Sequence, residues 1–128
     1  MLTAARLVAF AATVELDRSH AFFGEVLGLR RVEATPFANA YDVSGTPLRV
    51  TLVEAHVPPP FTVLRWQVPD VDDAVAFLAS RGIRFNRYPG TFQDAAGIWT
   101  SPSGARVAWF EDPDGNILSV TRLPVVNA

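Results

Sequence analysis

The sequence contains no cysteine among its 128 residues. This absence excludes disulfide frameworks, thiol nucleophiles and thiolate metal sites together. Histidine is scarce as well, because only His20 and His56 are present. No apolar run approaches the ~20 residues of a membrane-spanning helix, and the N-terminal sequence MLTAARLVAF lacks the long apolar segment and cleavage site of a signal peptide. We therefore expect a soluble, cytoplasmic protein without a membrane partner.

An excess of charge of one sign is also lacking. Eleven basic residues, which are scattered, stand against thirteen acidic ones and give a formal net charge of −2. A nucleic-acid-binding surface normally shows a basic stripe, so we expect no nucleic-acid partner. What the sequence does contain is apolar residues, 49 % of the total. That is enough for the core of one ordinary domain without a metal or a disulfide.

The first half of the chain predicts a strand, a helix and three further strands. Residues 4–13 are small and branched apolar residues, as in a buried strand. Residues 15–29 have apolar residues on one helical stripe, and Gly28 stands where the helix should stop. The stripe consists of Leu16, Phe23 and Leu27. The three strands are residues 30–35, 39–44 and 47–54, with a hairpin turn at residues 44–47.

The second half predicts the same order of elements after a proline-rich linker, AHVPPP, at residues 55–60. The predicted helix, residues 69–82, has Val71, Val75 and Leu78 on one stripe. The predicted strands are residues 61–68, 83–88, 105–112 and 116–123, with a loop at 89–104. We interpret the chain as a single domain, residues 1–128, made of module one (1–54), the linker and module two (61–128).

The two halves also match residue by residue near their ends. PLRVT at residues 47–51 corresponds to ILSVT at 117–121, and a glycine precedes each, Gly45 and Gly115. A chance likeness between two unrelated halves is the alternative. The shared order of elements, the linker and the turn favour a true repeat, and the sequence therefore predicts an α+β fold of two tandem βαβββ modules.

Two motifs resemble those of the vicinal oxygen chelate superfamily, which includes glyoxalase I, extradiol dioxygenases, fosfomycin-resistance enzymes and bleomycin-resistance proteins. Residues 18–23 (RSHAFF) with 26–29 (VLGL) are similar to its helix motif, and residues 110–118 (FEDPDGNIL) are similar to its hairpin motif. The resemblance covers the whole chain. It implies two curled mixed sheets, each with a helix on its outer face, that enclose a cleft. It also implies a homodimer, which a large apolar concave face would favour on physical grounds.

The acids of the hairpin motif have two interpretations, catalytic groups or turn formers. Pro113 fixes φ near the value that a tight turn needs, and Gly115 can take a positive φ. Asp112 or Asp114 can then cap free backbone N–H groups. We favour the turn-forming interpretation.

The resemblance implies four metal-ligand positions, usually His or Gln, then Glu, His and Glu. In this sequence they fall, in that order, on Val8, on Arg49 or (with a register shift of two residues) Thr51, on Val63 and on Ser119. None of these side chains suits a divalent ion that must keep a coordination position open for substrate. We interpret His20 as a packed, hydrogen-bonded helix residue. We therefore expect the protein to bind no metal and no other cofactor, and we assign no catalytic residue.

Strand alternation predicts which residues face the cleft. The predicted ligand-binding residues are Phe10, Arg49, Thr51, Phe61, Val63, Arg65, Trp99 and Ser119. Trp99 is predicted in a loop, where it could stack on a ligand or seal a dimer, whereas Trp66 and Trp109 are assigned to the core. Arg49 and Arg65 could instead pair with acids across the sheet. Apolar and aromatic walls with two guanidiniums would suit a flat, semi-polar small molecule.

Three functions remain open from the sequence. The favoured hypothesis is a metal-free binding protein of the bleomycin-resistance type that sequesters an aromatic or antibiotic-like metabolite. The second is a glyoxalase- or dioxygenase-type lyase, isomerase or oxygenase with an atypical or absent metal site. The third is a metal-free enzyme in which Arg65 or Arg49 stabilises an enolate-like charge, although the sequence offers no convincing base.

Overall fold

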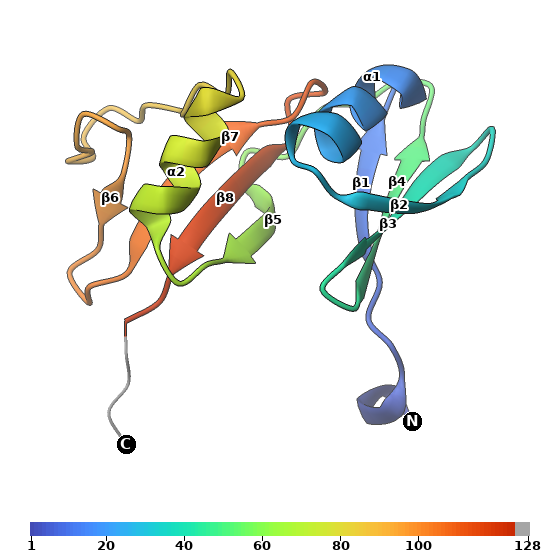
Figure 1. Ribbon diagram of the computed structural model, residues 1–128, viewed down its shortest axis with the longest axis horizontal. Coiled ribbons are helices and arrows are strands. Elements are labelled where there is room, and N and C mark those ends of the chain that lie inside the picture. The colour runs from blue at the N-terminus through green and yellow to red at the C-terminus, as the bar shows by residue number, and fades with distance from the viewer. Residues whose placement is uncertain (125–128) are drawn as a thin grey trace. The chain divides into compact units, whose positions relative to one another are not determined.

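A computed structural model describes residues 1–124 of the chain. The chain divides into two compact units, one of residues 1–58 with 112–115 and the other of residues 59–111 with the residues from 116 onward. Each unit holds a four-stranded mixed sheet and one principal helical segment (Figure 1). The predicted α+β fold of two tandem modules is confirmed. None of the described helices has the length and apolar character needed to cross a membrane.

The first sheet has the strand order β1-β4-β3-β2, and β1 runs parallel to β4. Its strands are Ala9–Thr13 (β1), Arg30–Ala34 (β2), Ala38–Val43 (β3) and Thr46–Leu52 (β4). The predicted hairpin between β3 and β4 is confirmed. Ser44 and Gly45 have φ values of 48° and 86°, and two consecutive positive values match the twist of a two-residue hairpin.

The first strand is shorter than the sequence predicts. Leu2–Ala4 form a short 3-10 helix, η1, and β1 begins only at Ala9, which pairs with Leu48 of β4. The residue of β4 before Leu48 is Pro47, which has no N–H to donate to a longer ladder.

The first helix changes character half-way along. It begins as α1, Leu16–His20, and continues as a π-helical stretch, η2, over Ala21–Val26, where the sequence predicts a regular helix. The His20 ring lies over Gly24, and its Nδ1 atom is 2.9 Å from the hydroxyl oxygen of the buried Tyr41. The π-helical stretch therefore begins at the turn that faces the contact between His20 and Tyr41. The prediction that His20 is a packed, hydrogen-bonded helix residue is confirmed.

The second sheet has the strand order β5-β8-β7-β6, and β5 runs parallel to β8. Its elements are Thr62–Gln67 (β5), Val71–Ser80 (α2), Trp99–Thr100 (β6), Arg106–Glu111 (β7) and Ile117–Arg122 (β8). Asp70 caps α2 by accepting a hydrogen bond from the backbone N–H of Asp73 at 3.1 Å. The ladders repeat the register of the first sheet, since Arg49 pairs with Phe10 and its equivalent Ser119 pairs with Arg65.

The strand predicted at residues 83–88 is wrong. This segment makes one backbone bond to β7, from Asn86 N–H to the carbonyl of Trp109 at 2.7 Å, and no ladder. The side chain of Gln93 bonds two more backbone groups of this segment, because it donates to the carbonyl of Asn86 and accepts from the N–H of Tyr88. The edge of the sheet is left to β6, which lies inside the predicted loop and pairs with β7.

Replacing Gly24 with alanine should destabilise the protein. A Cβ there would lie 2.2 Å from a carbon of the His20 ring, and the bond to Tyr41 prevents the ring from moving away. We expect a loss of about 1–3 kcal/mol in the free energy of unfolding, against the gain of about 1 kcal/mol that alanine brings to an unobstructed helix. Chemical denaturation of Gly24→Ala, His20→Ala and the double variant measures this. A double variant as unstable as the sum of the two single changes would contradict it.

Candidate functional site

The two faces of the second sheet differ in what covers them. Phe85 lines a groove of about 420 Å³ together with Val75 and Ala79 of α2, and its ring packs edge-on against Phe110 at 5.8 Å between centroids. Phe110 therefore marks the face that α2 covers (Figure 1). Strand alternation puts a second set of residues on the other face, which we call the helix-free face. They are Arg65, Gln67, Trp99, Val107, Trp109, Glu111, Ile117, Ser119 and Thr121.

An aromatic cluster lies on the helix-free face. The rings of Trp99 and Trp109 are 6.0 Å apart between centroids and inclined by 33°, and the Tyr88 ring packs edge-on against Trp109 at 5.3 Å. Two predictions are corrected here. Trp99 lies in strand β6 rather than in a loop, and Trp109 lies on the face opposite α2 rather than in the core beneath it. Both tryptophans are half-buried.

Arg65 lies in one cross-strand row with Ser119 and Trp109. Its side chain is exposed and makes no ion pair or hydrogen bond with any residue from 1 to 124. Ser119 is only 1 % exposed, so its hydroxyl is not directly accessible. In the next row, the Oγ1 atom of Thr121 is buried and has no hydrogen-bond partner within the described residues. The face thus has a free guanidinium beside the aromatic cluster.

Glu111 belongs to the same face and was missed by the sequence analysis. It pairs with Ile117, one register step from the row of Arg65. Its carboxylate is exposed and has no ion-pair partner among the residues that the structure describes. Alternation from Trp109 identifies it as a residue of this face, although it stands next to the acids of the turn.

Gln93 holds the segment that carries the aromatic residues. Besides its bonds to Asn86 and Tyr88, its Nε2 donates to the carbonyl of Gly97 at 2.9 Å and its Oε1 accepts from the hydroxyl of Thr91 at 2.9 Å. All the polar atoms of this amide are therefore used. Nothing in the sequence pattern marks this glutamine, because its partners are backbone groups that become neighbours only in the folded chain.

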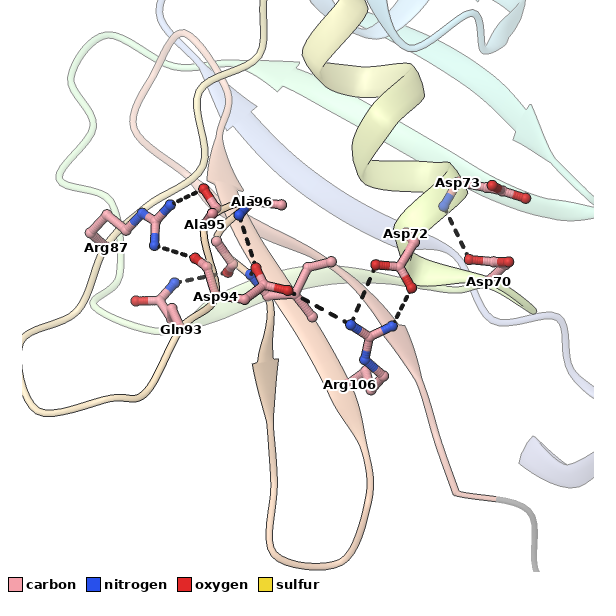
Figure 2. A network of polar contacts seen from close by, with 11 residues as sticks. Asp70, Asp72, Asp73, Arg87, Gln93, Asp94, Ala95, Ala96 and Arg106 are labelled. Atoms are coloured by element: carbon pink, nitrogen blue, oxygen red, sulfur yellow. Dashed lines mark hydrogen bonds and ion pairs between the residues drawn. The ribbon is translucent and has the colours of Figure 1, made fainter.

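A network of polar contacts holds the same segment near α2 (Figure 2). Arg106 of β7 binds Asp72 in the first turn of α2 and reaches Asp94 at 3.8 Å, while Arg87 donates to the carbonyls of Asp94 and Ala95 at 2.6 Å each. The hydrogen bond from Arg106 lowers the pKa of Asp72. A lowered pKa means that this contact stabilises the fold above the usual aspartate range and is lost as the pH falls through the lowered value.

The first sheet also has a helix-free face, and it carries three predicted site residues. Tyr41 packs on the helical residue Phe23 at 6.0 Å between ring centroids, so Phe10, Arg49 and Thr51 lie on the opposite face. Arg49 is 3.6 Å from the carboxylate of Glu33. The alternative that Arg49 pairs with an acid across the sheet is the one that the structure shows.

Two further predicted site residues stand where the regular ladder breaks. Val63 is the extra residue of a bulge, because Thr62 pairs with Ile117 and Leu64 pairs with the next residue, Leu118. Phe61 precedes β5 and is 62 % exposed. Strict alternation from Phe61 to Arg65 is therefore wrong, and nothing in the residue pattern marks the bulge.

The acids of the turn at residues 112–115 form hydrogen bonds within the first unit. Oδ1 of Asp112 accepts from the N–H of Asp114 at 2.9 Å. Oδ1 of Asp114 accepts from the N–H of Val14 and from Arg18, each at 2.9 Å. Gly115 has a φ of 84°. The capping interpretation of this turn is confirmed.

Among residues 1–124 no group of three or more His, Asp or Glu side chains is placed to hold a metal ion. The implied ligand positions carry two valines, a serine, and an arginine that is paired with Glu33 or a threonine. Thr51 and Ser119 offer only neutral hydroxyls, which are poor ligands for a divalent ion. The donor set does not fit the metal that other proteins with these motifs carry.

The family model of the Glyoxalase/Bleomycin resistance protein/Dioxygenase superfamily matches residues 6–120. The chain belongs to this superfamily. No curated protein matches the sequence. Solved structures with the same fold include a fosfomycin resistance protein from Listeria monocytogenes, with a TM-score of 0.74, 10 % identity and 95 % of each chain covered. A lactoylglutathione lyase from Agrobacterium tumefaciens has a TM-score of 0.72, 18 % identity and 93 % of each chain covered.

A third similar structure is a glyoxalase/bleomycin resistance protein/dioxygenase from Nocardioides, with a TM-score of 0.68 and 18 % identity. The match covers 98 % of this chain and 91 % of the Nocardioides chain. At these identities the likeness shows the fold and does not choose between an enzyme and a binding protein of this superfamily.

Divalent zinc, nickel, iron or manganese should leave the melting temperature of the protein unchanged. An ion that binds only the folded state raises the stability of the protein by mass action. The four implied ligand positions offer such an ion no set of donor atoms. Differential scanning fluorimetry of chelator-treated protein, with each ion added in excess, measures this. A reproducible rise of several degrees with one ion would mean that other residues form a metal site.

Proposed function

We propose that the protein is a small-molecule-binding protein of the bleomycin-resistance type that holds a planar, partly aromatic ligand on the helix-free face of the second sheet. The observation that carries the proposal is that the unpaired guanidinium of Arg65 shares a cross-strand row with Trp109, against which Trp99 packs. Indole rings supply large surfaces for stacking. A free guanidinium supplies a strong, directional donor for a carboxylate or carbonyl oxygen.

The two predicted site arginines, Arg49 and Arg65, differ in whether an acidic side chain lies beside them. Arg49 has Glu33 as a neighbour 3.6 Å away, and a ligand anion would have to compete with that carboxylate. Arg65 has no such partner in the described part of the chain, so a ligand can use its full donor capacity. The proposal therefore makes Arg65 the anchor for the polar end of the ligand and gives the aromatic cluster the flat end.

Replacing Trp99 with alanine should weaken the binding of 2-naphthoate, a flat aromatic anion that serves as the probe. Loss of one stacking surface, or of the charge-assisted bond in Arg65→Gln, should weaken binding by roughly ten- to a hundredfold, since each contributes on the order of 1–3 kcal/mol. Isothermal titration calorimetry measures the dissociation constant. The probe should also quench less tryptophan fluorescence in Trp99→Ala than in the wild-type protein.

Two controls accompany this measurement. Phe110→Ala removes a fully buried ring from the face under α2 and should lower the free energy of unfolding by about 3–5 kcal/mol. Trp99 is only half-buried at the edge of the sheet, so Trp99→Ala should shift the melting temperature only slightly. Arg49→Gln should leave binding of the probe nearly unchanged. Wild-type affinity in both Trp99→Ala and Arg65→Gln would refute the proposed site.

We also propose that the protein is a homodimer. Large apolar side chains are exposed on the chain as described, among them Phe10 at 60 %, Phe37 at 71 % and Phe92 at 94 %. A soluble protein rarely leaves so many large rings in water, and a symmetric pair of chains is the commonest way to cover them. Size-exclusion chromatography with light scattering should give twice the 13.9 kDa mass of one chain. A single-chain mass at micromolar concentration would be the contrary result.

A further inference from the structure

The helix-free face of the second sheet carries two opposite charges that no other part of the described chain neutralises. Arg65 lies on β5 and Glu111 lies on β7, with β8 between them. Both side chains are exposed, and neither has an ion-pair partner among residues 1–124. Free charges of opposite sign that share one face and do not meet suggest a ligand with charges of its own.

The ladder fixes how far apart the two charges are anchored. Arg65 pairs with Ser119 and Glu111 pairs with Ile117, so the two residues are offset by two strands and by one step of two residues. Strands about 4.8 Å apart and about 3.3 Å per residue place the two Cα atoms on the order of 12 Å apart. Their flexible side chains can therefore meet the two ends of an aromatic molecule of one or two rings.

Trp109 lies beside this diagonal, in the row of Arg65 and two residues before Glu111 on β7. Its indole gives the ring system of such a molecule a surface to stack on. Next to Glu111 a second anion would be repelled, whereas an ammonium group or another strong donor would be attracted.

We propose that the ligand is a dipolar aromatic molecule, with an anionic group held by Arg65 and a cationic or strongly hydrogen-bond-donating group beside Glu111. This inference rests on the proposed function and adds the charge pattern of the ligand to it. It makes Glu111 a specificity-determining residue and Arg65 an affinity-determining one.

Three naphthalenes that share one carboxylate and differ only at the far end test the inference. They are 6-(aminomethyl)-2-naphthoate, 2-naphthoate and naphthalene-2,6-dicarboxylate. Calorimetry on the full chain should give the tightest binding for the first and the weakest for the third. Each step should be about threefold, the size expected of one exposed charge pair.

The variants assign the effect to single residues. Glu111→Gln should bring the three dissociation constants within experimental error of one another, and Glu111→Lys should reverse their order. Arg65→Gln should weaken all three probes. Glu25→Gln removes the same charge from an exposed position in the first unit and should leave the original order intact.

The possible outcomes separate the two proposals. Binding of 2-naphthoate that depends on Arg65, together with equal affinities for the three probes in the wild type, would overturn the dipolar ligand and leave the proposed binding site standing. An order that survives in Glu111→Gln would remove Glu111 from the inference. Absence of binding for all three probes would overturn both proposals.

Discussion

Parallel pairing between the first and the last strand of each module is the constraint on which the rest of the structure depends. Parallel strands cannot be joined by a short turn, so the chain has to cross over between them. In the second unit α2 carries the chain from β5 to the opposite edge of the sheet, where β6 begins, and it covers one face of the sheet on the way. The same connection leaves the other face without a helix, and that is the face with Arg65 and the tryptophans. The site is therefore a direct result of the topology.

The second unit departs from the first at its edge strand, and the departure builds the site. The side-chain amide of Gln93 bonds the carbonyl of Asn86 and the N–H of Tyr88, two backbone groups that a strand partner could otherwise use. The chain can then make a detour before it returns as β6, so that Tyr88 before the detour and Trp99 after it both pack against Trp109. The first unit has no comparable insertion, because β2 follows closely on its helix.

The sequence predicted the features that local pattern controls. Period-2 alternation located most of the strands, and the match of PLRVT with ILSVT gave the equivalence of Arg49 and Ser119 that the two ladders bear out. The features that it missed depend on contacts between distant residues. The π-helical stretch lies where His20 contacts Tyr41, residues 83–88 bond to the side chain of Gln93 and form no ladder, and Val63 is the extra residue of a bulge. The side of the sheet that Trp109 occupies follows from its register with Ser119.

The closeness of Trp99 and Trp109 has a consequence for how the molecule interacts with light. Two indoles whose centroids are 6.0 Å apart, at an inclination of 33°, do not absorb independently, because their transition dipoles couple at that separation. The coupling gives a signed pair of bands in circular dichroism that neither ring would show alone. Its sign and size depend on the mutual orientation of the rings. The aromatic cluster is thus also an intrinsic chromophore whose spectrum reports the conformation of β6 against β7.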